Sequence, residues 1–177
     1  STTSEIISTD GKTRVKLINV YRSPAKNTEE SSIKAVENIF RSAGTNTIIL
    51  GDINLPEVDF KALTSQNYPG TNLTRCSSLL ATMEERSFEQ YVDFPTRVPI
   101  IERVASGEFD HIPVHDIVSS NAVGIVQNIE SIGSIGKSDH VAVVFELNLK
   151  TKIISKQLVN DYRKADWTKM KERMATW

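Results

Sequence analysis

The chain contains the stretch Thr47-Ile-Ile-Leu-Gly-Asp-Ile-Asn54, an apolar run that leads directly into a glycine and two polar residues. An apolar run without alternation predicts a short strand that is buried on both faces of a sheet. Asp52 and Asn54 are two residues apart, so in an extended loop their side chains point the same way. A carboxylate and an amide placed like this can hold a water and a phosphate oxygen, although the same residues are common in turns.

Further strands and helices are predicted on both sides of this stretch. We expect strands over residues 13–21, 89–94, 114–119, 123–132 and 141–147, and helices over residues 28–43, 74–86 and 156–177. Strands and helices alternate in the first half, and strands dominate the second half. This order predicts a mixed α/β sandwich with helices packed outside the sheets.

The composition is that of one globular domain. The chain has 177 residues, of which 39% are hydrophobic and 24% are charged. Its single cysteine, Cys76, excludes an internal disulfide framework and a cysteine-built zinc site. No apolar stretch approaches the ~20 residues that cross a bilayer, and the polar start predicts a protein that is not secreted.

The charge differs between the body and the tail of the chain. Residues 1–150 carry 14 basic and 19 acidic side chains, whereas residues 151–177 carry 7 basic and 3 acidic ones. An acidic body argues against a general phosphate-binding surface. A nucleic-acid enzyme remains possible if the acidic residues cluster around a cation.

A second polar segment, Gly136-Lys-Ser-Asp-His140, lies just before the predicted strand 141–147. Asp139 could bind a divalent cation and His140 could contact a phosphate, but a solvated turn explains the same residues. Asp116 has apolar neighbours in a predicted strand, where an unpaired carboxylate is costly to bury. An imidazolium such as His140 is a natural partner for it. Tyr21 ends another strand, where its hydroxyl could reach a phosphate.

In this order the segments resemble the endonuclease/exonuclease/phosphatase superfamily, above all the apurinic-endonuclease-like domain of non-LTR (LINE-type) retrotransposon polyproteins. The resemblance covers residues 13–175. The residues that show it are Asn19-Val-Tyr-Arg-Ser-Pro24, Leu50-Gly-Asp-Ile-Asn-Leu-Pro56 and Gly136-Lys-Ser-Asp-His140. Asp161-Tyr-Arg-Lys-Ala-Asp-Trp167 is similar to the segment that joins the endonuclease to the reverse transcriptase in those polyproteins.

The resemblance implies a four-layer α/β sandwich, made of two sheets with outer helices, and Mg²⁺-dependent hydrolysis of a phosphodiester in DNA, with Mn²⁺ as a possible substitute. It implies that Asp52 orients or deprotonates the attacking water and that Asn54 holds a phosphate oxygen. His140, paired with Asp116, would contact the scissile phosphate. The further implied contacts are Tyr21 to the phosphate, Asp139 to the metal, and Arg22, Thr96 and Arg97 to the DNA backbone.

One departure from the family concerns the length of the domain. The family domain begins well before Ser1, and its first half supplies an asparagine and a glutamate that is a main Mg²⁺ ligand. We therefore expect residues 13–150 to form the C-terminal part of the domain, inactive alone and prone to aggregate through an uncovered apolar sheet face. Residues 1–12 are expected to be disordered or part of a strand, and residues 151–177 to be a basic linker helix toward a reverse transcriptase.

Several alternatives remain open at the level of sequence. Asp110 rivals Asp116 as the partner of His140, because the stretch between Arg97 and Asp116 is longer than expected. The same fold could act on an inositol phosphate or a sphingomyelin, or the chain could be a non-catalytic remnant or nucleic-acid-binding module. An element that cuts chromosomal DNA acts in the nucleus, and otherwise we expect a cytoplasmic protein.

Overall fold

A computed structural model describes residues 1–8, 11–23, 29–55, 58–60, 64–65, 73–98 and 115–149. The described elements, in chain order, are β1 (Thr2–Ile7), β2 (Arg14–Asn19), α1 (Glu29–Ser42), β3 (Thr47–Asp52), β4 (Val58–Asp59), β5 (Thr64–Ser65), α2 (Leu73–Glu85), β6 (Glu89–Gln90), β7 (Asp116–Ser120), β8 (Val126–Ser134) and β9 (Val141–Leu147). None of the helices described is long and apolar enough to span a membrane.

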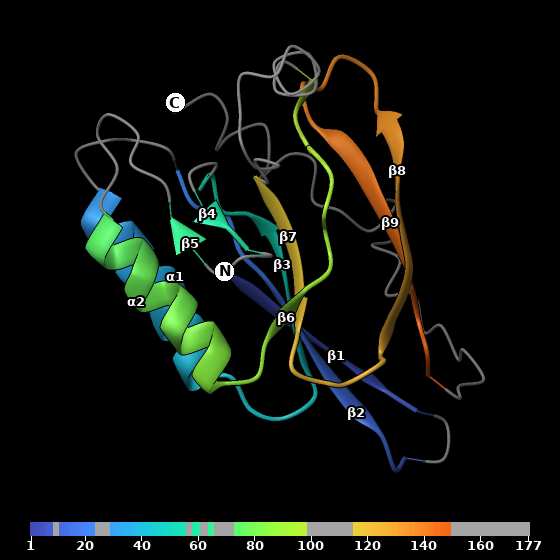
Figure 1. The fold of residues 1–177 in the computed structure, drawn as a ribbon. Helices are drawn as coiled ribbons and strands as arrows, with labels where there is room; N and C mark the ends of the chain where they lie inside the picture. Colours follow the sequence, from blue (N-terminus) through green and yellow to red (C-terminus); the bar gives the residue numbers. More distant parts are fainter. Residues whose placement is uncertain are drawn as a thin grey trace, which may run out of the picture.

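The strands form a five-stranded sheet in the order β1-β2-β3-β7-β6 and two two-stranded sheets, β4-β5 and β8-β9. In the large sheet β2 and β3 run parallel, and the other neighbouring strands are antiparallel. The helices α1 and α2 cover one face of the large sheet, and β8-β9 lies on its other side (Figure 1). The predicted mixed α/β sandwich is thus confirmed. The part of the chain that the structure describes contains no helix layer outside β8-β9.

The helices predicted over residues 28–43 and 74–86 both form, as α1 and α2, because each has an apolar stripe at helical spacing. The buried residues on these stripes are Ile33, Val36 and Phe40 of α1, and Cys76, Leu79, Leu80 and Met83 of α2. Phe40 also meets Phe88 edge to face, with ring centroids 4.9 Å apart. This packing fixes the helix layer on the sheet that positions the site.

The two helices are also joined by polar contacts at their C-terminal ends. Arg41 Nη2 donates to Glu37 Oε1 at 2.6 Å and to Thr82 Oγ1 at 2.9 Å. At the same end, Arg86 donates to the Ala43 carbonyl that follows α1, at 2.5 Å. The side chain of Glu37 is 8% exposed, so this carboxylate is anchored inside the helix layer.

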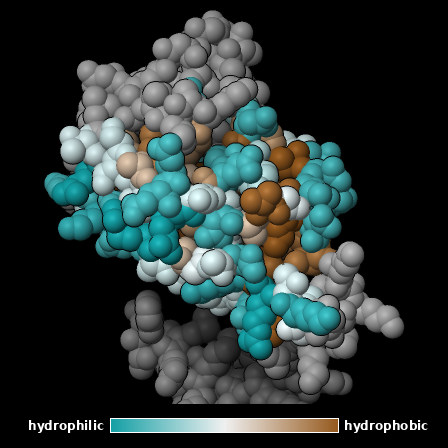
Figure 2. Space-filling model, turned by 60° about the horizontal axis from the view of Figure 1, so that its bottom comes forward, coloured by the Kyte–Doolittle hydropathy of each residue, from teal (hydrophilic) through white to brown (hydrophobic). Residues whose placement is uncertain are grey.

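The face of the large sheet toward β8-β9 is less completely covered than the face toward the helices. Asp52 pairs with Asp116 in register, and Asp116 contacts His140 beside β9, so residues in phase with this pair face β8-β9. On that face Leu17 and Leu50 are only half-buried, whereas Ile49, on the opposite face, is fully buried. Apolar surface is also visible between hydrophilic flanks when the lower end of the molecule is turned forward (Figure 2).

The structure differs from the sequence-based expectations at several elements. Residues 2–7, expected to be disordered or part of a strand, form β1 and pair along their whole length with β2. The strand expected over residues 89–94 is limited to Glu89–Gln90, and β8 begins at Val126 rather than at 123. Two short strands, β4 and β5, form between β3 and α2, where no strand is predicted from the sequence. The tail, residues 151–177, and Asp110 lie outside the described residues.

Candidate functional site

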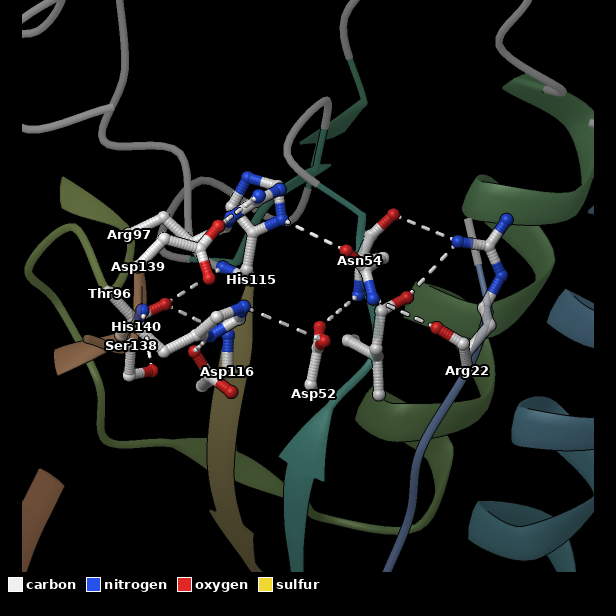
Figure 3. A network of polar contacts seen from close by, with 11 residues as sticks. Arg22, Asp52, Asn54, Thr96, Arg97, His115, Asp116, Ser138, Asp139 and His140 are labelled. Carbon is white, nitrogen blue, oxygen red and sulfur yellow. Dashed lines mark hydrogen bonds and ion pairs between the residues drawn. The ribbon is translucent and has the colours of Figure 1, made fainter. Parts of the chain in front are cut away.

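The candidate site lies at one edge of the large sheet, where β3 ends and β7 begins (Figure 3). Because these strands are antiparallel, Asp52 at the end of β3 is directly opposite Asp116 at the start of β7. His140 precedes β9 and reaches the same place from the second sheet. We call Asp52, Asp116 and His140 the carboxylate–histidine cluster.

The cluster is closely spaced and partly open to solvent. His140 Nδ1 is 2.7 Å from Asp116 Oδ2, and His140 Nε2 is 3.9 Å from Asp52 Oδ2. The side chains are 18%, 22% and 27% exposed for Asp52, Asp116 and His140. One ring nitrogen therefore has a carboxylate partner, while the other faces a second carboxylate across a gap.

Burial raises the pKa of the Asp52 carboxyl, and the nearby Asp116 carboxylate raises it further. A hydrogen bond from Asn54 and the charge of His140 act in the opposite direction. The Asn54 backbone N–H donates to Asp52 Oδ1 at 3.0 Å, which directs the other carboxylate oxygen toward His140. Asp52 thus binds a proton more readily than a solvated carboxylate does.

The side chains of the cluster offer donor atoms that suit a divalent cation. Its three side chains offer ligand atoms that all lie within 4.8 Å of one another. Two of the three donors are carboxylates, the ligands that hard cations prefer. Their mutual repulsion, visible in the raised pKa of Asp52, is what a cation between them would relieve.

The position of Asp52 depends on the glycine before it. Gly51 has a φ of 131°, and a Cβ atom built there would lie 1.9 Å from the Val20 carbonyl oxygen. Glycine therefore lets the ends of β2 and β3 approach closely. Asn54, at a φ of 48°, then turns the chain away from the sheet.

Arg22, expected at the DNA backbone, is 5% exposed. Its Nη1 donates to the carbonyls of Ile53 and Asn54 at 3.1 and 2.8 Å, and its Nε donates to Ser32 Oγ at 3.0 Å. The structure thus places this side chain beneath residues 52–54.

Thr96 and Arg97 occupy a segment between the two sheets. Thr96 is fully buried, and its Oγ1 accepts the backbone N–H groups of His115 and Asp116 at 3.3 and 3.0 Å. Arg97 pairs with Asp139, the expected metal ligand, and this pairing lowers the pKa of the Asp139 carboxyl. Asp139 is therefore near the cluster but held by an arginine.

Tyr21 is exposed to solvent, whereas Asn54 is hydrogen-bonded within the site. Tyr21 is 69% exposed and has no part in the polar network of Figure 3. The Asn54 amide donates to the Arg22 carbonyl at 2.9 Å. The roles expected for both residues stay predictions.

His115 is a site residue that the sequence analysis missed. It is 5% exposed, and its Nδ1 lies 3.4 Å from Asn54 Oδ1. Its Nε2 is buried without a hydrogen-bond partner in the described part of the chain. Burial, together with the nearby Arg97 charge, lowers the pKa of His115 to about 4. The sequence pattern around His115 is that of an ordinary strand residue. Its position next to Asp116 is the one sequence signal that could have indicated a place in the site.

Comparison with known proteins defines the class of this domain. A family described as endonuclease-reverse transcriptase matches residues 15–144, and the chain belongs to this family. The chain is also similar to a solved structure, the endonuclease domain of TRAS1, a telomere-specific non-LTR retrotransposon. The TM-score is 0.51 and the identity 18%, over 78% of this chain and 58% of that one. This likeness supports the fold, and no curated protein sequence gives a match.

Proposed function

We propose that this chain contains the phosphodiester-cleaving centre of a DNA-nicking endonuclease domain, in a non-LTR retrotransposon polyprotein that also has a reverse transcriptase. The observation that supports this most strongly is the carboxylate–histidine cluster. One carboxylate holds His140 at 2.7 Å, and a second lies 3.9 Å from its free nitrogen. This arrangement suits the attack of a water on a phosphate, which needs both a base and a positive contact.

Each member of the cluster has a distinct role in the proposed reaction. Asp52 accepts a proton from water while the water oxygen bonds to phosphorus and a P–O ester bond breaks, and the leaving oxygen takes a proton from solvent. His140, as an imidazolium, donates from Nε2 to a phosphate oxygen, and Asp116 stabilises the cation and fixes the ring.

The proposed cofactor is Mg²⁺, with Mn²⁺ as a substitute. A bound divalent ion supplies positive charge that stabilises the transition state on phosphorus. Asp52 and Asp116 would hold it, since each is a partly exposed carboxylate of the cluster. The resemblance adds Asp139, whose carboxylate must be shared with Arg97.

The surrounding residues are proposed to bind the DNA strand. Asn54 retains a second amide hydrogen beyond the one donated to Arg22, and this hydrogen suits a phosphate oxygen. The exposed Tyr21 hydroxyl and the solvent-accessible edge of Arg97 suit further phosphate contacts. Thr96, which is fully buried, supports this surface through the backbone of Asp116.

The chain spans 58% of the length of the TRAS1 endonuclease structure that it matches. We propose that residues outside it complete the metal site, so that the chain alone does not nick DNA, and that the whole protein acts in the nucleus. The second candidate function is a nucleic-acid-binding module without catalysis. It is favoured by the pairing of Asp139 with Arg97 rather than with the cluster.

Nicking of supercoiled plasmid in Mg²⁺ tests this proposal. The assay compares the full endonuclease domain with its His140→Ala variant, and Lys137→Ala serves as the control in the same turn. We expect a loss of at least about 10²-fold for His140→Ala and little change for Lys137→Ala. DNA binding without Mg²⁺-dependent nicking in the full domain would favour the binding module instead. Nicking by the isolated chain would refute only the proposed inactivity.

A further inference from the structure

Arg22 makes an unusual set of contacts for a residue beside a proposed DNA-binding site. It is 5% exposed, and its partners among the described residues are neutral: two backbone carbonyls and the Ser32 hydroxyl. Burying a guanidinium without a carboxylate is costly unless its N–H groups are satisfied. The guanidinium donates to carbonyls of the 52–54 loop (Figure 3). Its Nε donates to Ser32 of α1.

The main chain of Arg22 adds two more contacts to the same loop. Its backbone N–H donates to the Asp52 carbonyl at 2.8 Å, and its carbonyl accepts the Asn54 amide at 2.9 Å. Residues 52, 53 and 54 are therefore each bonded to Arg22. Because β3 ends at Asp52, strand pairing does not hold the carbonyls of Ile53 and Asn54, and the guanidinium donates hydrogen bonds to both.

We infer that Arg22 is a positioning residue that fixes the 52–54 loop, and with it the Asp52 carboxylate, against α1. This inference rests on the proposed function and assigns Arg22 to the protein interior instead of to the DNA. A lysine cannot replace it, because one ammonium does not span two carbonyls and the Ser32 hydroxyl in a fixed plane. The loop then moves relative to His140, and chemistry suffers more than DNA binding.

Nuclear magnetic resonance of the unmodified chain tests the inference without any activity. The Arg22 Nε–H must exchange slowly with water, as expected for a buried donor to Ser32. Rapid exchange at this nitrogen would overturn the inference, whether or not the protein cleaves DNA. In Arg22→Lys we expect shifted amide signals for residues 52–54. The control is Arg75→Lys, an arginine of α2 that is ion-paired to Glu30 on the helix surface and should leave these signals unchanged.

Kinetics and binding in the full domain separate positioning from DNA contact. We expect Arg22→Lys to lower kcat at least about 10-fold, with the Kd for a short duplex and its salt dependence unchanged. Arg22→Gln removes the charge, and we expect it too to leave Kd and its salt dependence unchanged. A weaker Kd with a salt slope reduced by about one in Arg22→Gln would instead identify a phosphate contact and overturn the inference. If the loop signals shift but even the unmodified domain does not nick, the positioning role stands and the proposed function fails.

Discussion

The location of the Asp52 carboxylate lowers the stability of the folded protein once this group has lost its proton. Burial and the facing Asp116 raise its pKa, so the folded protein holds a proton at a pH where the unfolded chain has released it. Stability therefore falls as pH rises through the interval between the usual and the raised pKa. Active sites commonly show this conflict between stability and activity.

We expect Asp52→Asn to raise the melting temperature at pH 7 while abolishing nicking in the full domain. The asparagine oxygen can still accept the Asn54 N–H but carries no charge beside Asp116. The gain in melting temperature should disappear at acidic pH, where the wild-type Asp52 is protonated. Thermal unfolding at several pH values measures this, and an equal or lower melting temperature at pH 7 would contradict it.

Gly51 supports a second prediction at the scale of one residue. Gly51→Ala should destabilise the fold by about 3 kcal/mol, because the Cβ would collide with the Val20 carbonyl at a positive φ. Gly124→Ala is the matched control: Gly124 also has a positive φ, of 68°, but open space around it. It should cost only about 1 kcal/mol. Denaturant unfolding compares the two, and equal costs would show that the collision is relieved.

At the residue scale, the sequence identified the three residues of the carboxylate–histidine cluster better than the buried residues that surround them. The structure brings Asp52, Asp116 and His140 together, as their motifs and the family resemblance predict, although their roles remain to be tested. Arg22 was expected at the surface, because its burial depends on the carbonyls of a loop far along the chain. His115 was missed for the same reason, since its partner Asn54 lies in the loop after β3, far away along the chain.

At the scale of elements, the contact between α1 and α2 depends on the buried Glu37. The hydrogen bond from Arg41 lowers the pKa of Glu37 below its usual value of 4.5. The folded state therefore gains stability from this carboxylate above that pH and loses it as pH falls through the lowered pKa. The contact holds the helix layer together without adding to the site.

We expect Glu37→Gln to destabilise the chain at pH 7 by about 1 kcal/mol, since one hydrogen bond to a charged group is weakened. The difference from wild type should shrink at acidic pH, as the pH falls below 4.5 and through the lowered pKa of Glu37. Glu5→Gln, in an exposed pair with Arg14 at 3.7 Å, is the control and should change little. Urea unfolding at both pH values measures the two variants. A pH-independent loss for Glu37→Gln would show that packing, rather than charge, is responsible.

Periodicity explains which elements could be predicted. The helices α1 and α2 were found because their apolar stripes repeat at helical spacing, and β9 was found with its observed bounds because all of its residues except Glu146 are apolar. β1 was predicted only as one of two alternatives, a strand or disorder, since it is a polar edge strand whose only half-buried side chain is Ile6. An edge strand is defined by its pairing with β2, and that pairing leaves little trace in composition.

For the whole molecule, metal binding should be coupled to folding. We expect Mg²⁺ to raise the melting temperature in a concentration-dependent way, because the ion binds only where β3 and β7 bring two carboxylates together. Asp52→Asn combined with Asp116→Asn should abolish the shift. Asp139→Asn should retain most of it, since Asp139 pairs with Arg97. Thermal unfolding with and without the ion decides, and a shift lost in Asp139→Asn would make Asp139 the principal ligand.

The pairing of β3 with β7 also has a kinetic consequence. It joins segments separated by α2, β6 and a long stretch of chain. The chain therefore loses the entropy of closing a long loop before the paired strands stabilise each other. A slip of one residue in this register would turn Asp116 toward the helices, away from His140. The cluster therefore cannot form in a partly folded chain, and we expect competence to bind metal to arise late in folding, at the same time as the large sheet closes.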